Sequence, residues 1–403
     1  MSRLAEVLPR RIDLRFLLLA SLLTTIGIVM VVSTTAGSPR ADLAGKQLLF
    51  AVLGLIAAGI FLAIDYRILL QYSPGLYALT LLVLLYLPIF GKRIAGAKSW
   101  IKVAGGFQIQ PSEFARISIA LLLAWILEND DRPILRTRTL FALAAAVGVP
   151  VLLVLAQPDL GVALTYMPFL VAALFFGGLR TRWWVALVLA GVLAIGGSWF
   201  LLKDYQKDRI RTFLDPNLAA RGAGYQVRQA RIAIGSGGIL GKGWKQGTQS
   251  RLGFLPVRHT DFIFAALAEE WGFAGVACLL GLYGFLIARA LAIARDARDR
   301  GGSMLVLLLI TNVAGQFLVN VAMNVGVLPT TGITLPFLSY GGSSLIVMLG
   351  SVGVLLNIAR NGGRTAAAVP DRGRRDGRTR RAGTRSGGGA PAPRRARDVR
   401  RVS

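Results

Sequence analysis

Four short polar clusters interrupt an otherwise strongly apolar chain, and they hold the residue types that acid–base chemistry requires. Each cluster adjoins an apolar segment, and two of them carry an aspartate, Asp159 and Asp261. A carboxylate at an apolar boundary is a natural general base, because partial desolvation raises its pKa while basic neighbours hold that pKa down. The clusters are Gly96–Lys102, Gln110–Arg116, Gln157–Gly161 and His259–Ala265, which leads to Glu269 and Glu270.

The same residues also have plain structural interpretations. Pro111 is placed to start a helix, so Glu113 and Arg116 would share one helical face and could pair merely to order its first turn. Asp159 and Asp261 could each cap a helix, because aspartate accepts N–H bonds at helix starts. The residue types alone leave both interpretations open.

Membrane-spanning helices must position these clusters. The chain has 403 residues, of which 54% are hydrophobic. The apolar residues form blocks close to the ~20 residues that a helix needs to cross a bilayer. We expect an all-α polytopic membrane protein with about ten transmembrane helices and a large outer loop between the seventh and eighth spans. The predicted spans are Phe16–Ala36, Gln47–Ile64, Pro74–Phe90, Phe114–Leu127, Leu140–Ala156, Val162–Gly178, Trp183–Leu202, Phe262–Ala288, Met304–Val325 and Ser343–Ile358.

The first block follows several arginines, as a signal peptide would, but further apolar blocks continue after it, so we interpret it as a span. If the N-terminus is inside, every predicted internal segment is basic, which places both termini in the cytoplasm. The expected parts are a basic N-terminus (1–15), a membrane domain (16–360) that contains the large outer loop (203–261), and a tail (361–403).

The formal net charge of +26 reflects this tail, which is rich in Arg, Gly, Pro, Ala and Ser. Such a composition predicts a disordered cytoplasmic segment held near anionic lipid headgroups, with RNA binding as the alternative. For the protein as a whole we expect membrane lipids, and not nucleic acid, as partners.

Two outer loops are also basic. Gly91–Ser112 includes Lys102, and the large loop includes Lys242 and Arg258. These charges are either solvated or form a basic outer face that holds an anionic substrate.

Three further segments of the chain are informative. Tyr225–Ile234 has a helical period that fits an amphipathic interfacial helix. Gly235–Gly243 is either a plain turn or a flexible loop whose amides meet phosphate. Pro329–Ser343 is dense in hydroxyls, glycine and proline, and irregular backbone at membrane depth must be buried in protein or line a cavity.

The inventory of metal ligands is small. One histidine, His259, and one cysteine, Cys278, exclude a multi-histidine metal site and a Cys/His nucleophile pair. Carboxylates are available for a divalent cation such as Mg²⁺ or Mn²⁺, but no ligand spacing is diagnostic, so no metal site is assigned.

Taken together, these motifs resemble the SEDS family of bacterial cell-wall proteins, whose members include RodA, FtsW and SpoVE. The resemblance runs from about Leu14 to Ile358, and the Gly241–Trp244 and Gly247–Ser250 stretches resemble the elongation members more than the division members. It rests on Ala97–Ile101, Gln110–Glu113, Gln157–Gly161, Gly224–Gln226, Ile234–Gly238, Gly247–Ser250, His259–Phe264, Glu269–Glu270 and Pro336–Gly342.

The resemblance implies a peptidoglycan glycosyltransferase of the bacterial inner membrane that polymerises lipid II at the outer face during cell elongation. Undecaprenyl diphosphate would be the leaving group. The implied partners are a class B penicillin-binding protein, which is a transpeptidase, and other membrane proteins of the elongation complex. Asp261 would be the general base, with Glu113 and Asp159 as further catalytic residues.

The expected substrate contacts complete the site. Arg116 stands where the family commonly has lysine, and Arg258 where an acidic residue is frequent; both keep or add positive charge, which suits diphosphate binding. The alternative functions are a lipid II flippase or transporter, and a non-catalytic scaffold for the transpeptidase. The substrate-binding candidates are Trp100, Lys102, Gln110, Arg116, Lys242, Arg258 and Ser339.

Overall fold

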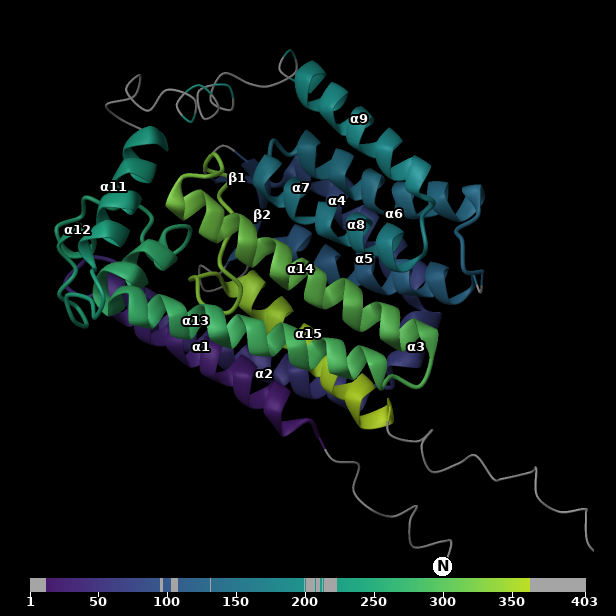
Figure 1. Ribbon diagram of the computed structural model, residues 1–403, viewed down its shortest axis with the longest axis horizontal. Helices are drawn as coiled ribbons and strands as arrows, with labels where there is room; N and C mark the ends of the chain where they lie inside the picture. The colour runs from purple at the N-terminus through teal and green to yellow at the C-terminus, as the bar shows by residue number, and fades with distance from the viewer. Residues whose placement is uncertain are drawn as a thin grey trace, which may run out of the picture. The chain divides into compact units, whose positions relative to one another are not determined.

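The computed structural model describes residues 12–94, 97–102, 108–130, 132–198 and 223–362, together with residues 200, 207, 211 and 213. Most of the expected N-terminal segment, a large part of the outer loop and almost all of the arginine-rich tail lie outside these residues. The described part is a bundle of helices with a small sheet at one end (Figure 1).

Seven described helices are long and apolar enough to cross a membrane. Three further expected spans correspond to α5 (Pro111–Glu128), to the consecutive helices α7 (Leu160–Thr165) and α8 (Met167–Phe176), and to α9 (Thr181–Ser198). The expectation of a ten-helix membrane protein is therefore confirmed. The seven are α1 (Leu14–Thr35), α2 (Asp42–Ala63), α4 (Ser73–Phe90), α6 (Thr137–Ala156), α13 (Ile263–Arg295), α14 (Arg300–Val325) and α15 (Gly342–Gly362).

Short elements connect the spans. They are the helices α3 (Tyr66–Gln71), α11 (Ala223–Ser236) and α12 (Thr248–Arg251), and the strands β1 (Lys92–Ile94), β2 (Ala97–Lys102) and β3 (Gln108–Ile109). The helix predicted at Tyr225–Ile234 is thus confirmed as α11. The antiparallel sheet, in the order β1-β2-β3, was not expected. It sets Trp100 opposite Lys92, and Lys102 opposite Gln108.

Helices α5, α14 and α15 form the centre of the bundle, and α15 packs along α2. This contact is close because Gly353 faces the backbone of α2, where an added Cβ would lie 2.2 Å from the Ala58 carbonyl oxygen. The opposite surface of α2 and much of α4 expose large apolar side chains such as Ile56 and Leu82, as lipid-facing helices do.

The sixth expected span is broken into α7 and α8 at Tyr166. Pro168 has no N–H, so the regular helical ladder cannot continue through it. The Phe169 amide bonds to the Tyr166 carbonyl at 3.1 Å, and the Thr165 carbonyl instead accepts a bond from Asn312 of α14 at 2.6 Å. A partner on a neighbouring helix therefore compensates for the break.

Helix α13 is also interrupted, at Gly272, where φ is 63°. The glycine-rich segment Gly235–Gly243 satisfies the backbone groups on both sides of this interruption. The amides of Phe273 and Ala274 donate to carbonyls of that segment at 2.8 and 2.9 Å. In return, the segment's amides donate to the Glu269 and Glu270 carbonyls at 3.0 and 2.9 Å. Two of its amides are thus bound within the fold, which supports the plain turn over a phosphate loop.

Replacement of Gly272 by alanine should destabilise the protein strongly. An added Cβ would lie 2.3 Å from the Gly241 nitrogen and 2.6 Å from the Ile239 oxygen, in a backbone conformation that alanine resists. We expect the free energy of unfolding to fall by at least about 2 kcal/mol, measured by thermal unfolding in detergent. Gly281→Ala on the same helix is the control, since an added Cβ there meets nothing within 4 Å. Equal stability of the two variants would contradict the prediction.

Candidate functional site

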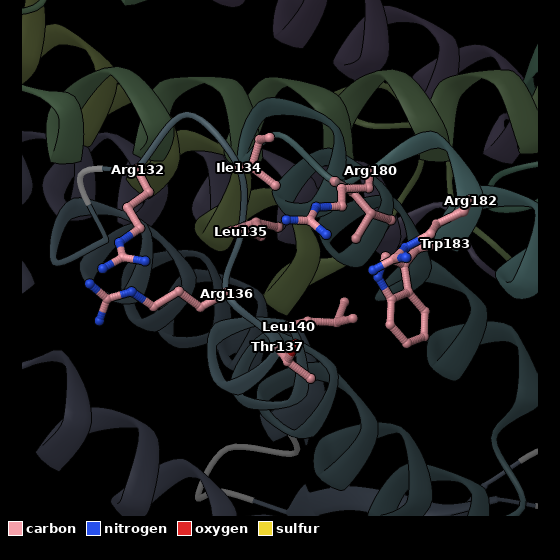
Figure 2. Close-up of a pocket in the computed structure, with 10 residues that line it drawn as sticks. Arg132, Ile134, Leu135, Arg136, Thr137, Leu140, Arg180, Arg182 and Trp183 are labelled. Carbon is pink, nitrogen blue, oxygen red and sulfur yellow. The ribbon is translucent and has the colours of Figure 1, made fainter.

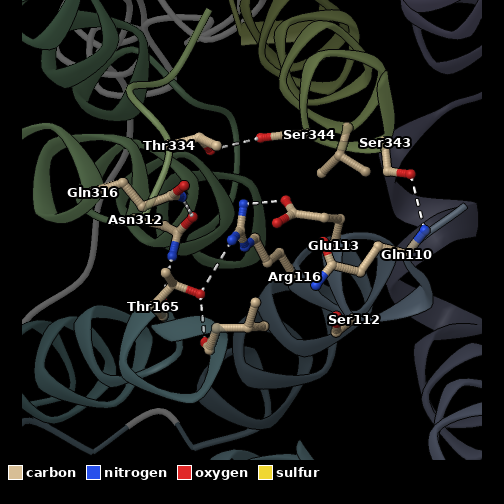
Figure 3. A network of polar contacts seen from close by, with 12 residues as sticks. Gln110, Ser112, Glu113, Arg116, Thr165, Asn312, Gln316, Thr334, Ser343 and Ser344 are labelled. Atoms are coloured by element: carbon tan, nitrogen blue, oxygen red, sulfur yellow. Dashed lines mark hydrogen bonds and ion pairs between the residues drawn. The ribbon is translucent and has the colours of Figure 1, made fainter. Parts of the chain in front are cut away.

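All four polar clusters and the Pro329–Ser343 segment meet at one end of the bundle. Gln110 occupies the N-cap position of α5 without a side-chain cap, and its backbone amide donates to the Ser343 hydroxyl at 3.0 Å, at the start of α15. The Thr334 and Ser344 hydroxyls lie 3.4 Å apart beside it (Figure 3). Segments distant in sequence therefore converge where the sequence predicted a site.

Asp159 joins the first three clusters. One carboxylate oxygen accepts the Val162 amide at 3.1 Å, so the residue caps α7 as its structural interpretation predicted. The other oxygen accepts the Ser99 hydroxyl of β2 and the Gln110 side-chain amide, each at 3.2 Å. Asp159 thus caps a helix and also joins β2 and the start of α5 to α7, while its expected catalytic role stays a prediction.

Glu113 and Arg116 form an ion pair inside the protein, where they are 5% and 3% exposed. Arg116 also donates to the Thr165 hydroxyl at 3.2 Å, which ties α5 to α7 beside the break (Figure 3). Glu113 further interacts with Ser344 and with the charge of Asp159. The pair is more than a device to order one helix start, because it joins three helices.

Arg116 is buried and already paired in this structure. Arg116 is committed to Glu113 in this structure, so its expected role as a diphosphate ligand would require that it leave or share this pair. Its Nε atom is buried without a hydrogen-bond partner among the described residues, as is the Oε1 atom of Gln316.

A row of carboxamides on α14 was missed in the sequence. Asn312, Gln316, Asn320 and Asn324 recur at every fourth residue and are all buried. That spacing places them on one face of the helix. Amide side chains inside a membrane span are costly and mark functional interiors. The spacing within an apolar segment was the signal that could have revealed this row.

The carboxamides fix the backbone at Asp261. Its carbonyl oxygen accepts a bond from Asn320 and another from Asn324, each at 3.0 Å. The two preceding carbonyls are held as well: Thr260 by the Ser339 hydroxyl at 2.6 Å, and His259 by the Tyr340 amide at 2.8 Å. Three successive peptide groups are therefore fixed by α14 and the segment that precedes α15.

Two neighbouring residues of that segment lie close to the start of α7 and to Asp261. Gly161 lies against Thr331, since a Cβ at Gly161 would be 2.2 Å from the Thr331 carbonyl oxygen. A Cβ at the next residue, Gly332, would be 3.8 Å from a carboxylate oxygen of Asp261. The segment therefore packs tightly on the start of α7 at Gly161, where a side chain would clash, and it passes Asp261 at ordinary contact distance.

The other predicted substrate contacts have varied positions. Lys242 forms an ion pair with Glu269 at 2.9 Å, and Arg258 donates to the Thr34 carbonyl at 2.6 Å. Ser339 is buried and holds the Thr260 carbonyl. Trp100 and Lys102 lie on β2, where Lys102 is exposed and Trp100 is partly buried. Their expected contacts with substrate stay predictions.

Glu269 and Glu270 have structural partners. Glu269 accepts the amides of Gln249 and Ser250 at 2.8 and 3.1 Å, so it caps α12 from another helix. Glu270 accepts the Ser33 hydroxyl of α1 at 2.6 Å. The two carboxylates join the first half of α13 to the outer loop and to α1. Among the described residues, no group of three or more His, Cys, Asp or Glu side chains could hold a metal ion.

Comparison with known proteins identifies the family. The chain matches the family model described as cell cycle protein, of the FtsW, RodA and SpoVE type, over residues 13–363. It is 41% identical to peptidoglycan glycosyltransferase MrdB of Escherichia coli K12, over 76% of this chain and 82% of that protein. It is 38% identical to stage V sporulation protein E of Bacillus subtilis, over 86% of this chain and 97% of that protein.

Solved structures agree with these relatives. A chain from a peptidoglycan synthase complex that coordinates polymerization and crosslinking superposes with a TM-score of 0.75 at 34% identity, over 88% of this chain and 99% of that one. Rod shape determining protein RodA of Thermus thermophilus gives a TM-score of 0.66 at 33% identity, over 87% and 97%. Fold and relatives together define a multi-pass membrane glycosyltransferase. The chain belongs to the FtsW, RodA and SpoVE family.

The Glu113–Arg116 pair yields a stability prediction. Arg116→Met should lower the free energy of unfolding by about 3 to 5 kcal/mol, because it leaves a buried carboxylate uncompensated. Glu113→Gln combined with Arg116→Met should cost less than the two single changes added together. Thermal unfolding in detergent measures both. Lys46→Met is the control, since it breaks an exposed pair with Asp42 and should change stability little. Additive single effects would count against a coupled pair.

His259 yields a prediction on pH. Burial, with Arg40 and Arg258 nearby, lowers the pKa of His259 to about 4 from 6.5. The folded state therefore binds its proton less readily than the unfolded state does, and this contribution to stability is lost as pH falls from 6.5 toward 4. We expect His259→Gln to reduce the loss of thermal stability between about pH 7 and about pH 4.5. Because the chain has one histidine, the difference between the two curves belongs to it. Superimposable curves would refute the assignment.

Proposed function

We propose that this chain polymerises lipid II into glycan strands at the outer face of the bacterial inner membrane, with Asp261 as general base. The observation that carries the proposal is the fixed backbone at Asp261, whose carbonyl and the two before it are each held by hydrogen bonds. A base must be held within reach of the proton that it removes, and a fixed peptide supplies that precision.

The proposed reaction is a single displacement. The acceptor sugar's 4-hydroxyl oxygen forms a bond to the anomeric carbon of the lipid-linked donor, and its proton passes to the Asp261 carboxylate. The bond from that carbon to the diphosphate oxygen breaks, and undecaprenyl diphosphate leaves with the electron pair. The configuration at the anomeric carbon inverts. The proton on Asp261 then returns to solvent.

Cations are needed where the diphosphate departs, because negative charge develops on its bridging oxygen. Lys102 is exposed at the polar end, and Lys92 lies beside it. Arg258 directly precedes His259 and is partly buried, and Arg116 is more deeply buried. A Mg²⁺ or Mn²⁺ ion, where one takes part, would arrive on the diphosphate itself.

Asp159 and Glu113 are proposed to act through position and charge. Asp159 holds Ser99 and Gln110, which set the sheet and the start of α5 against α7. Glu113 holds Arg116 in place until the leaving group requires it. Both carboxylates would therefore organise the donor side, while Asp261 serves the acceptor hydroxyl.

The setting of the reaction follows the same proposal. Among the described residues, arginines of the predicted internal segments such as Arg67, Arg180 and Arg289 lie at the end of the bundle opposite the site, which supports an outward-facing site and cytoplasmic termini. The solved relative from a peptidoglycan synthase complex supports work alongside a class B penicillin-binding protein. The relatives named MrdB and FtsW match at 41% and 37% identity, so the role in elongation rests on the Gly241–Trp244 and Gly247–Ser250 stretches.

A lipid II flippase is the second candidate. The broken helices α7–α8 and α13 favour it, because interrupted spans are typical of transporters, where they line the substrate site. Both functions would use the same polar end. Reconstituted vesicles separate them: polymer formed from outer-leaflet lipid II supports the enzyme, and lipid movement without polymer supports the transporter.

The decisive test is polymerisation of labelled lipid II by the full-length chain, with and without the transpeptidase. Asp261→Asn should reduce the rate by at least about a hundredfold, because general-base catalysis contributes that much or more. Asp42→Asn, an exposed carboxylate at the same end of the bundle, is the matched control and should retain the wild-type rate. Full activity of Asp261→Asn at equal protein level would overturn the general-base assignment. Its inactivity with normal complex formation would exclude a mere scaffold.

A further inference from the structure

A pocket lies at the opposite end of the bundle from the site described above. It occupies about 140 Å³ between the α5–α6 and α8–α9 connections. Arg132 and Arg136 come from the first connection, Arg180 from the second, and Arg182 from the first turn of α9 (Figure 2). The remaining lining is largely apolar and includes Leu135, Leu140 and Trp183.

The four arginines differ from their neighbours at this end. Arg67 and Arg289 form ion pairs with Asp299 and Asp13, while within the described chain none of the four pocket arginines is in an ion pair. No acidic side chain lines the pocket. Among the described residues, Asp130 is held by the Thr139 hydroxyl at 2.5 Å and interacts electrostatically with Arg136. The pocket therefore carries an excess of positive charge.

Two helix starts add to this charge. Helices α6 and α9, of 20 and 18 residues, begin at Thr137 and Thr181, both beside the pocket. No side chain caps the start of α6, where Arg136 occupies the N-cap position. Uncapped amides and the helix dipole favour an anion at such a position. Guanidinium groups add planar donors that match phosphate oxygens.

The position of the pocket indicates that the anion belongs to a lipid. Helix α6 runs from the pocket toward the polar end, and its 20 residues span about 30 Å, which is the thickness of the hydrocarbon core. The pocket therefore lies at headgroup height, where tryptophan is also enriched. From Trp183 onward, α9 exposes Val185, Val188 and Val192, a surface along which an acyl chain can lie.

We propose that this pocket binds the phosphate group of an anionic membrane phospholipid, which neutralises the four arginines and holds the starts of α6 and α9 together. The glycerol and acyl chains extend over Trp183 and the exposed valines of α9. The site does not depend on the proposed glycosyl transfer, because it lies at the other end of the same helices.

The test uses the full-length protein in neutral detergent. Native mass spectrometry counts bound phosphatidylglycerol or phosphatidylcholine, and thermal unfolding measures stabilisation by each lipid and by soluble glycerol phosphate. We expect phosphatidylglycerol to bind and stabilise the wild type, phosphatidylcholine to act weakly, and glycerol phosphate not to act at the same concentration. Arg136→Gln with Arg180→Gln should weaken phosphatidylglycerol binding by at least about tenfold, because two charge-assisted contacts are lost.

The matched control removes the same charge elsewhere on this end. Arg295→Gln with Arg298→Gln changes two exposed arginines outside the pocket and should leave binding unchanged. Equal loss in both double variants, or no loss in the pocket variant, would overturn the site. Equal stabilisation by glycerol phosphate would overturn the lipid as ligand in favour of a soluble phosphate. If the double variant unfolds without lipid, Arg182→Gln alone should still lose binding.

Discussion

The demand that every buried backbone group find a partner governs this molecule. In the bilayer core, no water is available to hydrogen-bond an unpaired carbonyl or amide group. Yet the chain interrupts two spans and inserts an irregular segment before α15. Each departure is matched by donors and acceptors from elsewhere: Asn312 at the α7–α8 break, the glycine-rich segment at Gly272, and Asn320 with Ser339 around Asp261. Irregular backbone at membrane depth is therefore confined to places where the protein has already supplied partners.

The arrangement of charge follows from the same demand. Carboxylates at the polar end are fixed by hydrogen bonds before any substrate arrives, and the deepest, Glu113, is neutralised by Arg116. Asp159 serves both the helix start of α7 and the sheet. At the other end, Asp299 and Asp13 are paired with Arg67 and Arg289, whereas the pocket arginines are in no ion pair within the described chain. The two ends therefore differ in their charged groups: the polar end holds carboxylates in fixed positions, and the opposite end leaves the four pocket arginines accessible to lipid.

The sequence predicted what local pattern determines. Apolar length gave the spans, helical period gave α11, and motif content gave the family, while the polar clusters did converge at one end. The sheet and the partners of Glu269 could not be predicted, because they join residues far apart in the chain with no periodic signal. The carboxamide row on α14 was visible in principle, at every fourth residue, but its meaning required knowledge that Asp261 lies beside Asn320 and Asn324.

The interruption at Gly272 divides α13 into a long membrane rod and a short one that carries Asp261 at its far end. The glycine-rich segment Gly235–Gly243 is hydrogen-bonded to both sides of this interruption, so it holds the short and long parts of α13 in one fixed relation. Because hydrogen bonds from α14 and from the segment before α15 also hold the peptide groups at Asp261, the aspartate keeps one height along the bundle, set by helices that are themselves anchored in the bilayer.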